Sequence, residues 1–75
     1  MTKKYQTYQF VVDCASLHGD TIYSGTIVKL INCSQTTNMN MPICKVVKIE
    51  DFRNNEYYWD IDIPTVNFML CTKKI

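Results

Sequence analysis

Residues 57–63 alternate between two faces, one wholly aromatic or aliphatic and the other carrying two aspartates, and this stretch constrains the fold more than any other part of the chain. A period of two is the mark of a β-strand with one buried face. Pro64 follows directly and cannot donate a hydrogen bond to a central ladder, so we expect it to end the strand. The inward set is then Tyr57, Trp59, Ile61 and Ile63, and the outward set is Tyr58, Asp60 and Asp62.

Three earlier segments also have strand character. Residues 4–14 alternate, with an inward face formed by Tyr8, Phe10, Val12 and Cys14. Residues 22–32 form a second expected strand, in which Gly25 marks a bulge or a sharp corner. Residues 43–50 form a third, and residues 51–55, with paired asparagines, are expected to be the hairpin loop after it.

The C-terminal segment has two readings. Residues 65–67 suit a single helical turn, after which residues 68–74 can run as a short closing strand. A helix from Thr65 onwards is the alternative, because Val66, Met69 and Leu70 also fit helical spacing.

The overall composition favours one small β domain. Of the 75 residues, 47% are hydrophobic and only two are Gly and two Pro, while branched and aromatic side chains are plentiful. We therefore expect a mostly β fold, either a small five-stranded barrel or a curled antiparallel sheet, with one short C-terminal helical turn as an option. Closure of the sheet into a barrel would remove the exposed strand edges that promote aggregation.

Several classes of protein are disfavoured. Apolar runs are much shorter than the roughly 20 residues of a membrane span. The basic start is not followed by the apolar core of a secretory signal, so a cytoplasmic protein is expected. The four cysteines should then be reduced, largely buried thiols, with a disulfide framework of three possible pairings as the alternative. These are Cys14, Cys33, Cys44 and Cys71.

No motif indicates catalysis. His18 is the single histidine, and a lone loop histidine is most often a solvated side chain. Asp60 and Asp62 are two apart on a strand, which suits a solvated face better than an acid/base pair. The cysteines lack the close spacing of a zinc site. We expect no enzyme activity, no cofactor and no metal.

Charge is segregated along the chain, and this gives the first functional hypothesis. Residues 50–62 hold five acidic residues against Arg53 alone. An exposed Tyr58 among carboxylates would be a suitable interface anchor. The uncharged loop at residues 33–42 adds methionines, which adapt well to partners. The predicted protein-binding surface is Glu50, Asp51, Glu56, Tyr58, Asp60 and Asp62, with Met39 and Met41.

Basic residues gather at both termini and give a second hypothesis. If the first and last strands are neighbours, basic and aromatic side chains form one patch of the kind that binds single-stranded nucleic acid. The residues are Lys3, Lys4, Tyr5, Tyr8, Lys73 and Lys74. A homo-oligomer formed by pairing of exposed strand edges is a third, weaker reading.

Three short motifs follow one another in the chain: Gly19-Asp20-Thr21-Ile22, Gly25-Thr26-Ile27-Val28 and Ile63-Pro64, the last after a strand–hairpin–strand unit. This arrangement resembles the SH3-like barrels of the KOW type, which occur in nucleic-acid-associated and bacteriophage accessory proteins. The resemblance implies a small barrel. Together with the Asn-, Ile- and Lys-rich composition, it implies an accessory protein that binds and modulates or inhibits a host or phage protein, or alternatively binds nucleic acid.

Overall fold

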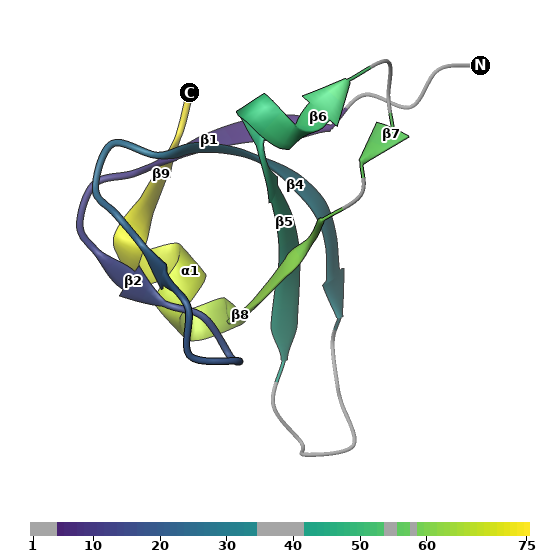
Figure 1. The fold of residues 1–75 in the computed structure, drawn as a ribbon. Coiled ribbons are helices and arrows are strands. Elements are labelled where there is room, and N and C mark those ends of the chain that lie inside the picture. Colours follow the sequence, from purple (N-terminus) through teal and green to yellow (C-terminus); the bar gives the residue numbers. More distant parts are fainter. Residues whose placement is uncertain (1–4, 35–41, 54–55, 58) are drawn as a thin grey trace.

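A five-stranded antiparallel sheet forms the body of the protein in a computed structural model that describes residues 5–34, 42–53, 56–57 and 59–75. Its strand order is β8-β5-β4-β1-β9, and the sheet curls strongly (Figure 1). The mostly β, antiparallel prediction is therefore confirmed. The strands are β1 (Gln6–Phe10), β4 (Ile27–Ser34), β5 (Ile43–Lys48), β8 (Ile61–Pro64) and β9 (Thr72–Lys74).

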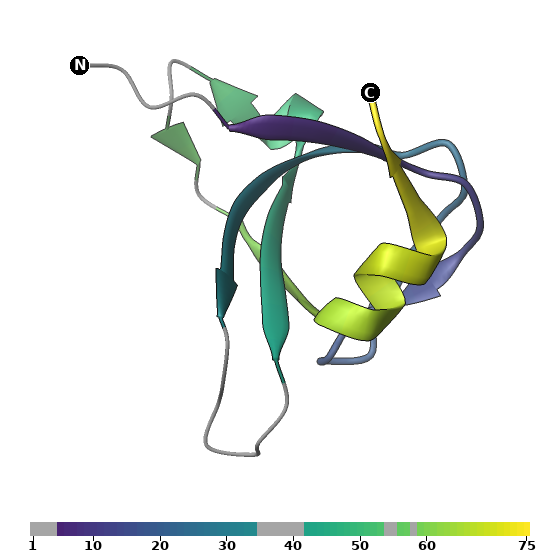
Figure 2. The same cartoon turned by 180° about the vertical axis from the view of Figure 1, so that it is seen from behind.

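The curled sheet does not close into a barrel within the described residues. Strands β8 and β9 are its two edges, and the helix α1 (Thr65–Cys71) connects them directly. Figure 2 shows α1 at the opening between these edges, where it contacts β8, β9 and β5. Of the two predicted architectures, the curled sheet is the correct one, because a helix occupies the place where the edge strands would otherwise meet.

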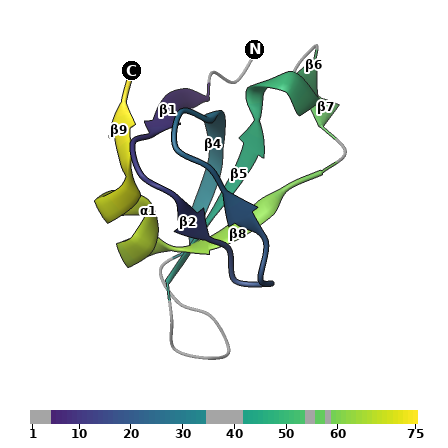
Figure 3. The ribbon, with the colours of Figure 1, turned by 60° about the vertical axis from the view of Figure 1, so that its left-hand side comes forward.

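Several short elements lie outside this sheet. β2 (Cys14–Ala15) and β3 (Thr21–Ile22) form one small hairpin, which Figure 3 shows in front of the sheet. A 3-10 turn, η1 (Ile49–Asp51), replaces the last residues of the predicted third strand. β6 (Phe52–Arg53) then pairs with β7 (Glu56–Tyr57), so a hairpin does occur here. The predicted loop at residues 51–55 was too long, because residue 51 belongs to η1 and residues 52–53 to β6; residues 54–55 lie outside the described residues.

The core lies inside the curl. It is formed by residues of the sheet strands β1, β4, β5 and β8, by the β2–β3 hairpin and by one residue of α1. Cys14 faces inward as predicted, and period two holds at Ile61 and Ile63. The buried cluster is Phe10, Cys14, Ile22, Val28, Cys44, Val46, Ile61, Ile63 and Phe68.

Two predictions for the first half of the chain were wrong. Val12 is 49% exposed, because β1 ends at Phe10 and the alternation ends with it. Gly25 does mark a corner, but this corner is a turn that separates β3 from β4, so residues 22–32 are not one strand. Its φ of 95° is in the left-handed region that glycine tolerates best, and its N–H donates to the carbonyl of Phe10 at 2.7 Å.

Both readings of the C-terminus were partly right. The helix extends to Cys71, well beyond the single turn of residues 65–67, and the closing strand shrinks to Thr72–Lys74. Phe68 explains this, because from the helix its buried ring packs edge-on against Tyr8 and Phe10, with centroids 4.9 and 6.2 Å away. Pro64 ends β8 as predicted.

Candidate functional site

A concave groove of about 470 Å³ opens on one side of the molecule. Three parts of the chain line it: β3 with the residue before it, the end of β5 with η1, and the segment that leads into β8. Its lining residues are Asp20, Thr21, Ile22, Lys48, Asp51, Trp59 and Ile61.

The β2–β3 hairpin is held in place by its own turn and by the sheet edge. Ser16 is buried, its N–H donates to the carbonyl of Asp20 at 2.7 Å, and its hydroxyl accepts from the N–H of Asp20 at 2.9 Å. The N–H of Leu17 donates to the carbonyl of Asp62 in β8 at 2.8 Å. These bonds fix Asp20 at the groove, opposite the chain that leads into β8.

Trp59 is the most conspicuous residue of the groove, with 67% of its surface exposed. Ile61, which lines the same groove, is only 8% exposed. The prediction that Trp59 points inward with Ile61 was therefore wrong. Residues 59 and 60 precede β8 and have no regular strand conformation, so the alternation that holds in the strand does not extend to them.

The charges at the groove favour a cationic ligand. Asp20 and Asp51 are exposed, and Lys48 is half-buried. Two carboxylates against one ammonium leave a net negative charge beside the indole of Trp59. A concave site lined by one predominant sign of charge concentrates ions of the opposite sign. The indole face attracts cations in addition.

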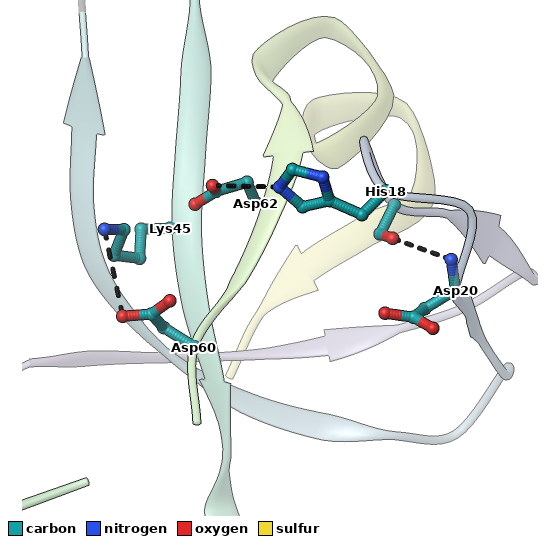
Figure 4. Close-up of polar contacts among 6 residues, drawn as sticks. His18, Asp20, Lys45, Asp60 and Asp62 are labelled. Carbon is teal, nitrogen blue, oxygen red and sulfur yellow. Dashed lines mark hydrogen bonds and ion pairs between the residues drawn. The ribbon is translucent and has the colours of Figure 1, made fainter. Parts of the chain in front are cut away.

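Asp60, just before β8, and Asp62, within it, do not line the groove. Asp62 Oδ2 lies 3.7 Å from His18 Nε2, and Asp60 Oδ2 lies 3.8 Å from Lys45 Nζ (Figure 4). Asp62 alternates with the buried Ile61 and Ile63 within β8, as predicted, whereas Asp60 is exposed just before the strand begins. Partly exposed ion pairs of this kind contribute little to stability.

The described members of the predicted acidic surface lie in several elements. Asp51 lines the groove, and Glu50 is exposed beside it in η1. Glu56 lies in β7. Tyr58, Met39 and Met41 lie outside the described residues. Sequence reasoning missed Trp59 and Asp20 as site residues, and the one available signal was the placement of Asp20 in a predicted loop.

The predicted basic patch requires that the first and last strands lie side by side, and they do. β1 and β9 pair, with Tyr8 opposite Lys74 and Gln9 opposite Lys73, and both lysines are exposed. The ring of Tyr8 packs against Phe68, and the ring of Tyr5 meets Phe52 edge-on at 5.5 Å. Lys3 and Lys4 lie outside the described residues.

The four cysteines are free thiols that lie in two pairs. Cys33 Sγ lies 2.6 Å from Cys44 Sγ. Burial raises the pKa of Cys14 to about 11, and a hydrogen bond with Cys71 and the charge of Cys71 add to this effect. Among the described side chains, no three or more of His, Cys, Asp and Glu are grouped to hold a metal ion.

Comparisons with protein families, with curated proteins and with solved structures found no match to this chain. Among the residues that the structure describes, no helix combines the length and the apolar character that crossing a membrane requires.

Proposed function

We propose that this chain is a non-enzymatic binding protein whose groove takes up a basic segment of a protein partner. The observation that carries the proposal is the exposure of Trp59 at a concave site that also presents Asp20 and Asp51. Exposed tryptophans are strongly enriched among the residues that dominate protein–protein binding. Their large rigid ring supplies contact area at a low entropic cost.

The groove matches a lysine or arginine side chain of the partner. A cation above the indole of Trp59 gains about 0.5–1 kcal/mol at an exposed site. The carboxylates of Asp20 or Asp51 can accept charge-assisted hydrogen bonds from the same group. The apolar stem of the partner's side chain can lie along the exposed ring of Trp59, which lines the groove.

Binding of this kind supports a modulating or inhibiting role. A small domain that covers a basic segment of a partner blocks every other ligand of that segment. This role needs no catalytic group, only a stable scaffold and a fixed groove. Electrostatic attraction between acidic groove and basic segment would also speed the encounter.

The test uses labelled peptides of equal length that are rich in lysine or arginine, in glutamate, or in neutral residues. Fluorescence anisotropy of each peptide is measured against the full chain. The basic peptides should bind best. Trp59→Ala should weaken this binding about tenfold or more, and Asp51→Asn should weaken it less. Asp60→Asn is the matched control, because Asp60 pairs with Lys45 and does not line the groove. Equal binding by wild type and Trp59→Ala would contradict the proposal.

A nucleic-acid-binding surface is the second candidate, and the pairing of β1 with β9 favours it because that pairing places Lys73 and Lys74 on one sheet edge. Its signature is binding of a labelled single-stranded oligonucleotide that weakens steeply with salt. The double variant Lys73→Glu, Lys74→Glu should then abolish the shift, while Trp59→Ala should leave it unchanged.

A further inference from the structure

Cys33 and Cys44 are direct partners across the antiparallel pair of β4 and β5. Their sulfur atoms are 2.6 Å apart, and both are free thiols. Directly opposite residues in such a pair have Cα atoms about 4.5–5.5 Å apart, which lies within the range of about 4.4–6.8 Å that disulfides span. A covalent bond between these two sulfurs therefore requires no movement of the strands.

The two thiols differ in access. Cys33 is exposed, whereas Cys44 is only 1% exposed. The sulfur of Cys44 also lies 3.4 Å from Thr65 Oγ1 at the start of α1, which holds it beside Cys33. Cys33 is therefore the residue of the pair that a reagent can approach from solvent, whereas Cys44 is covered.

We propose that Cys33 and Cys44 form a thiol–disulfide exchange site that low-molecular-weight disulfides oxidise, with Cys33 as the entry thiol and Cys44 as the resolving thiol. The thiolate of Cys33 attacks one sulfur of the small disulfide, whose S–S bond breaks and releases one small thiol. Cys44, after losing its proton, attacks the Cys33 sulfur of this mixed disulfide, and the second small thiol leaves. The protein's two thiols are oxidised, and the small disulfide is reduced to two thiols.

Oxidation would covalently close the connection between β4 and β5. The bond would link the two strands at a position where they already pair. The pKa of Cys33 is raised to about 11, mainly because its sulfur is desolvated, and also by the hydrogen bond to Cys44 and the charge of Cys44. Since the thiolate is the attacking species, exchange is slow at neutral pH and accelerates as pH rises.

Cys14 and Cys71 provide an internal comparison. Their thiols also interact, but Cys14 is buried and Cys71 is half-buried. This second pair has no exposed entry thiol, so the same reagent should oxidise it more slowly.

The experiment treats the reduced full chain with oxidised glutathione at pH 8 and follows its intact mass. The expected product has lost two hydrogen atoms, and peptide mapping without reduction should link Cys33 to Cys44 before any Cys14–Cys71 bond appears. A wild-type protein that accumulates glutathione on Cys33 without an internal bond would overturn the proposal. A first bond that joins Cys44 to Cys14 or Cys71 would overturn it as well.

Two variants identify the roles. Cys44→Ser should stop at a stable mixed disulfide between Cys33 and glutathione. Cys33→Ser should leave Cys44 unmodified for at least ten times longer than Cys33 in wild type. Cys71→Ser is the matched control and should form the Cys33–Cys44 bond at the wild-type rate. Circular dichroism checks that each variant is folded. Modification of Cys44 as fast in Cys33→Ser as of Cys33 in wild type would contradict the assigned order.

Discussion

The backbone N–H of Leu17 donates to the carbonyl of Asp62 at 2.8 Å, and this bond joins the β2–β3 hairpin to the edge strand β8. This hydrogen bond holds together the two parts of the chain between which the groove lies. Asp20 and Ile22 come from the hairpin, and Trp59 and Ile61 come from the chain that enters β8, so the bond sets the distance between two walls of the candidate site.

Leu17→Pro removes this hydrogen bond with little strain. Leu17 occupies the second position of a turn in which the N–H of Gly19 bonds to the carbonyl of Ser16 at 3.2 Å, and proline is favoured at that position. We expect a loss of about 1–2 kcal/mol in the free energy of unfolding, measured by urea denaturation. Leu17→Ala is the control, because it removes the same side chain and keeps the N–H. Equal losses in both variants would show that the hydrogen bond contributes nothing.

Phe68 should dominate the stability of α1. It is buried and packs against the rings of Tyr8 and Phe10, so Phe68→Ala should cost about 3–5 kcal/mol, which is most of the stability of so small a domain. Leu70→Ala, on the exposed side of the same helix, should change stability by less than about 0.5 kcal/mol. Thermal unfolding followed by circular dichroism measures both, and similar melting temperatures for the two variants would contradict the packing described.

Gly25 should be required for its backbone conformation alone. Its φ is 95°, and a Cβ built at this position meets nothing within 4 Å. Gly25→Ala should therefore cost about 1–2 kcal/mol through backbone strain without any steric clash. Gly25→Asn should cost less, because asparagine tolerates positive φ better. Chemical denaturation of both variants distinguishes this from a packing effect, in which the larger Asn side chain would be worse than Ala.

Thiol ionisation should lower stability at alkaline pH. The pKa of Cys33 rises from its ordinary value of 9.0 to about 11 in the folded protein. Between these values the unfolded thiol loses its proton while the folded thiol keeps it, so rising pH favours the unfolded state. Under reducing conditions, wild type should lose more unfolding free energy between pH 9 and pH 11 than Cys33→Ser. Parallel curves of unfolding free energy against pH for the two proteins would refute this linkage.

The alternation of apolar and polar residues correctly predicted the buried face of β8, because that face depends on residues close together in the sequence. Ile61 and Ile63 alternate with Asp62 because β8 pairs with β5 and has one covered face. The pairing of the first and last strands was expected only as a result of barrel closure, whereas β1 and β9 pair as neighbours within an open sheet. The extent of α1 was not predicted, since Phe68 fits a strand or a helix equally well by spacing. Contacts with Tyr8 and Phe10, far away in the chain, decide between them.

The candidate site was predictable only in part for the same reason. The acidic character of residues 50–62 is visible in the sequence, and Asp51 does line the groove. Trp59 was misplaced because it lies two residues before Ile61 and has the spacing of a buried strand residue, although the regular strand begins only at Ile61. Asp20 joins the site through a hydrogen bond between distant segments, which no local pattern records.

The groove at Trp59 is the central claim, and the most direct test is a two-dimensional NMR titration of the isotope-labelled chain with a lysine- and arginine-rich peptide. The chain has one tryptophan, so its single indole N–H signal reports on Trp59 alone. We predict that this signal and the backbone signals of Asp20, Ile22 and Asp51 shift together and saturate. A titration in which β1 and β9 signals shift while the indole signal stays in place would contradict the account.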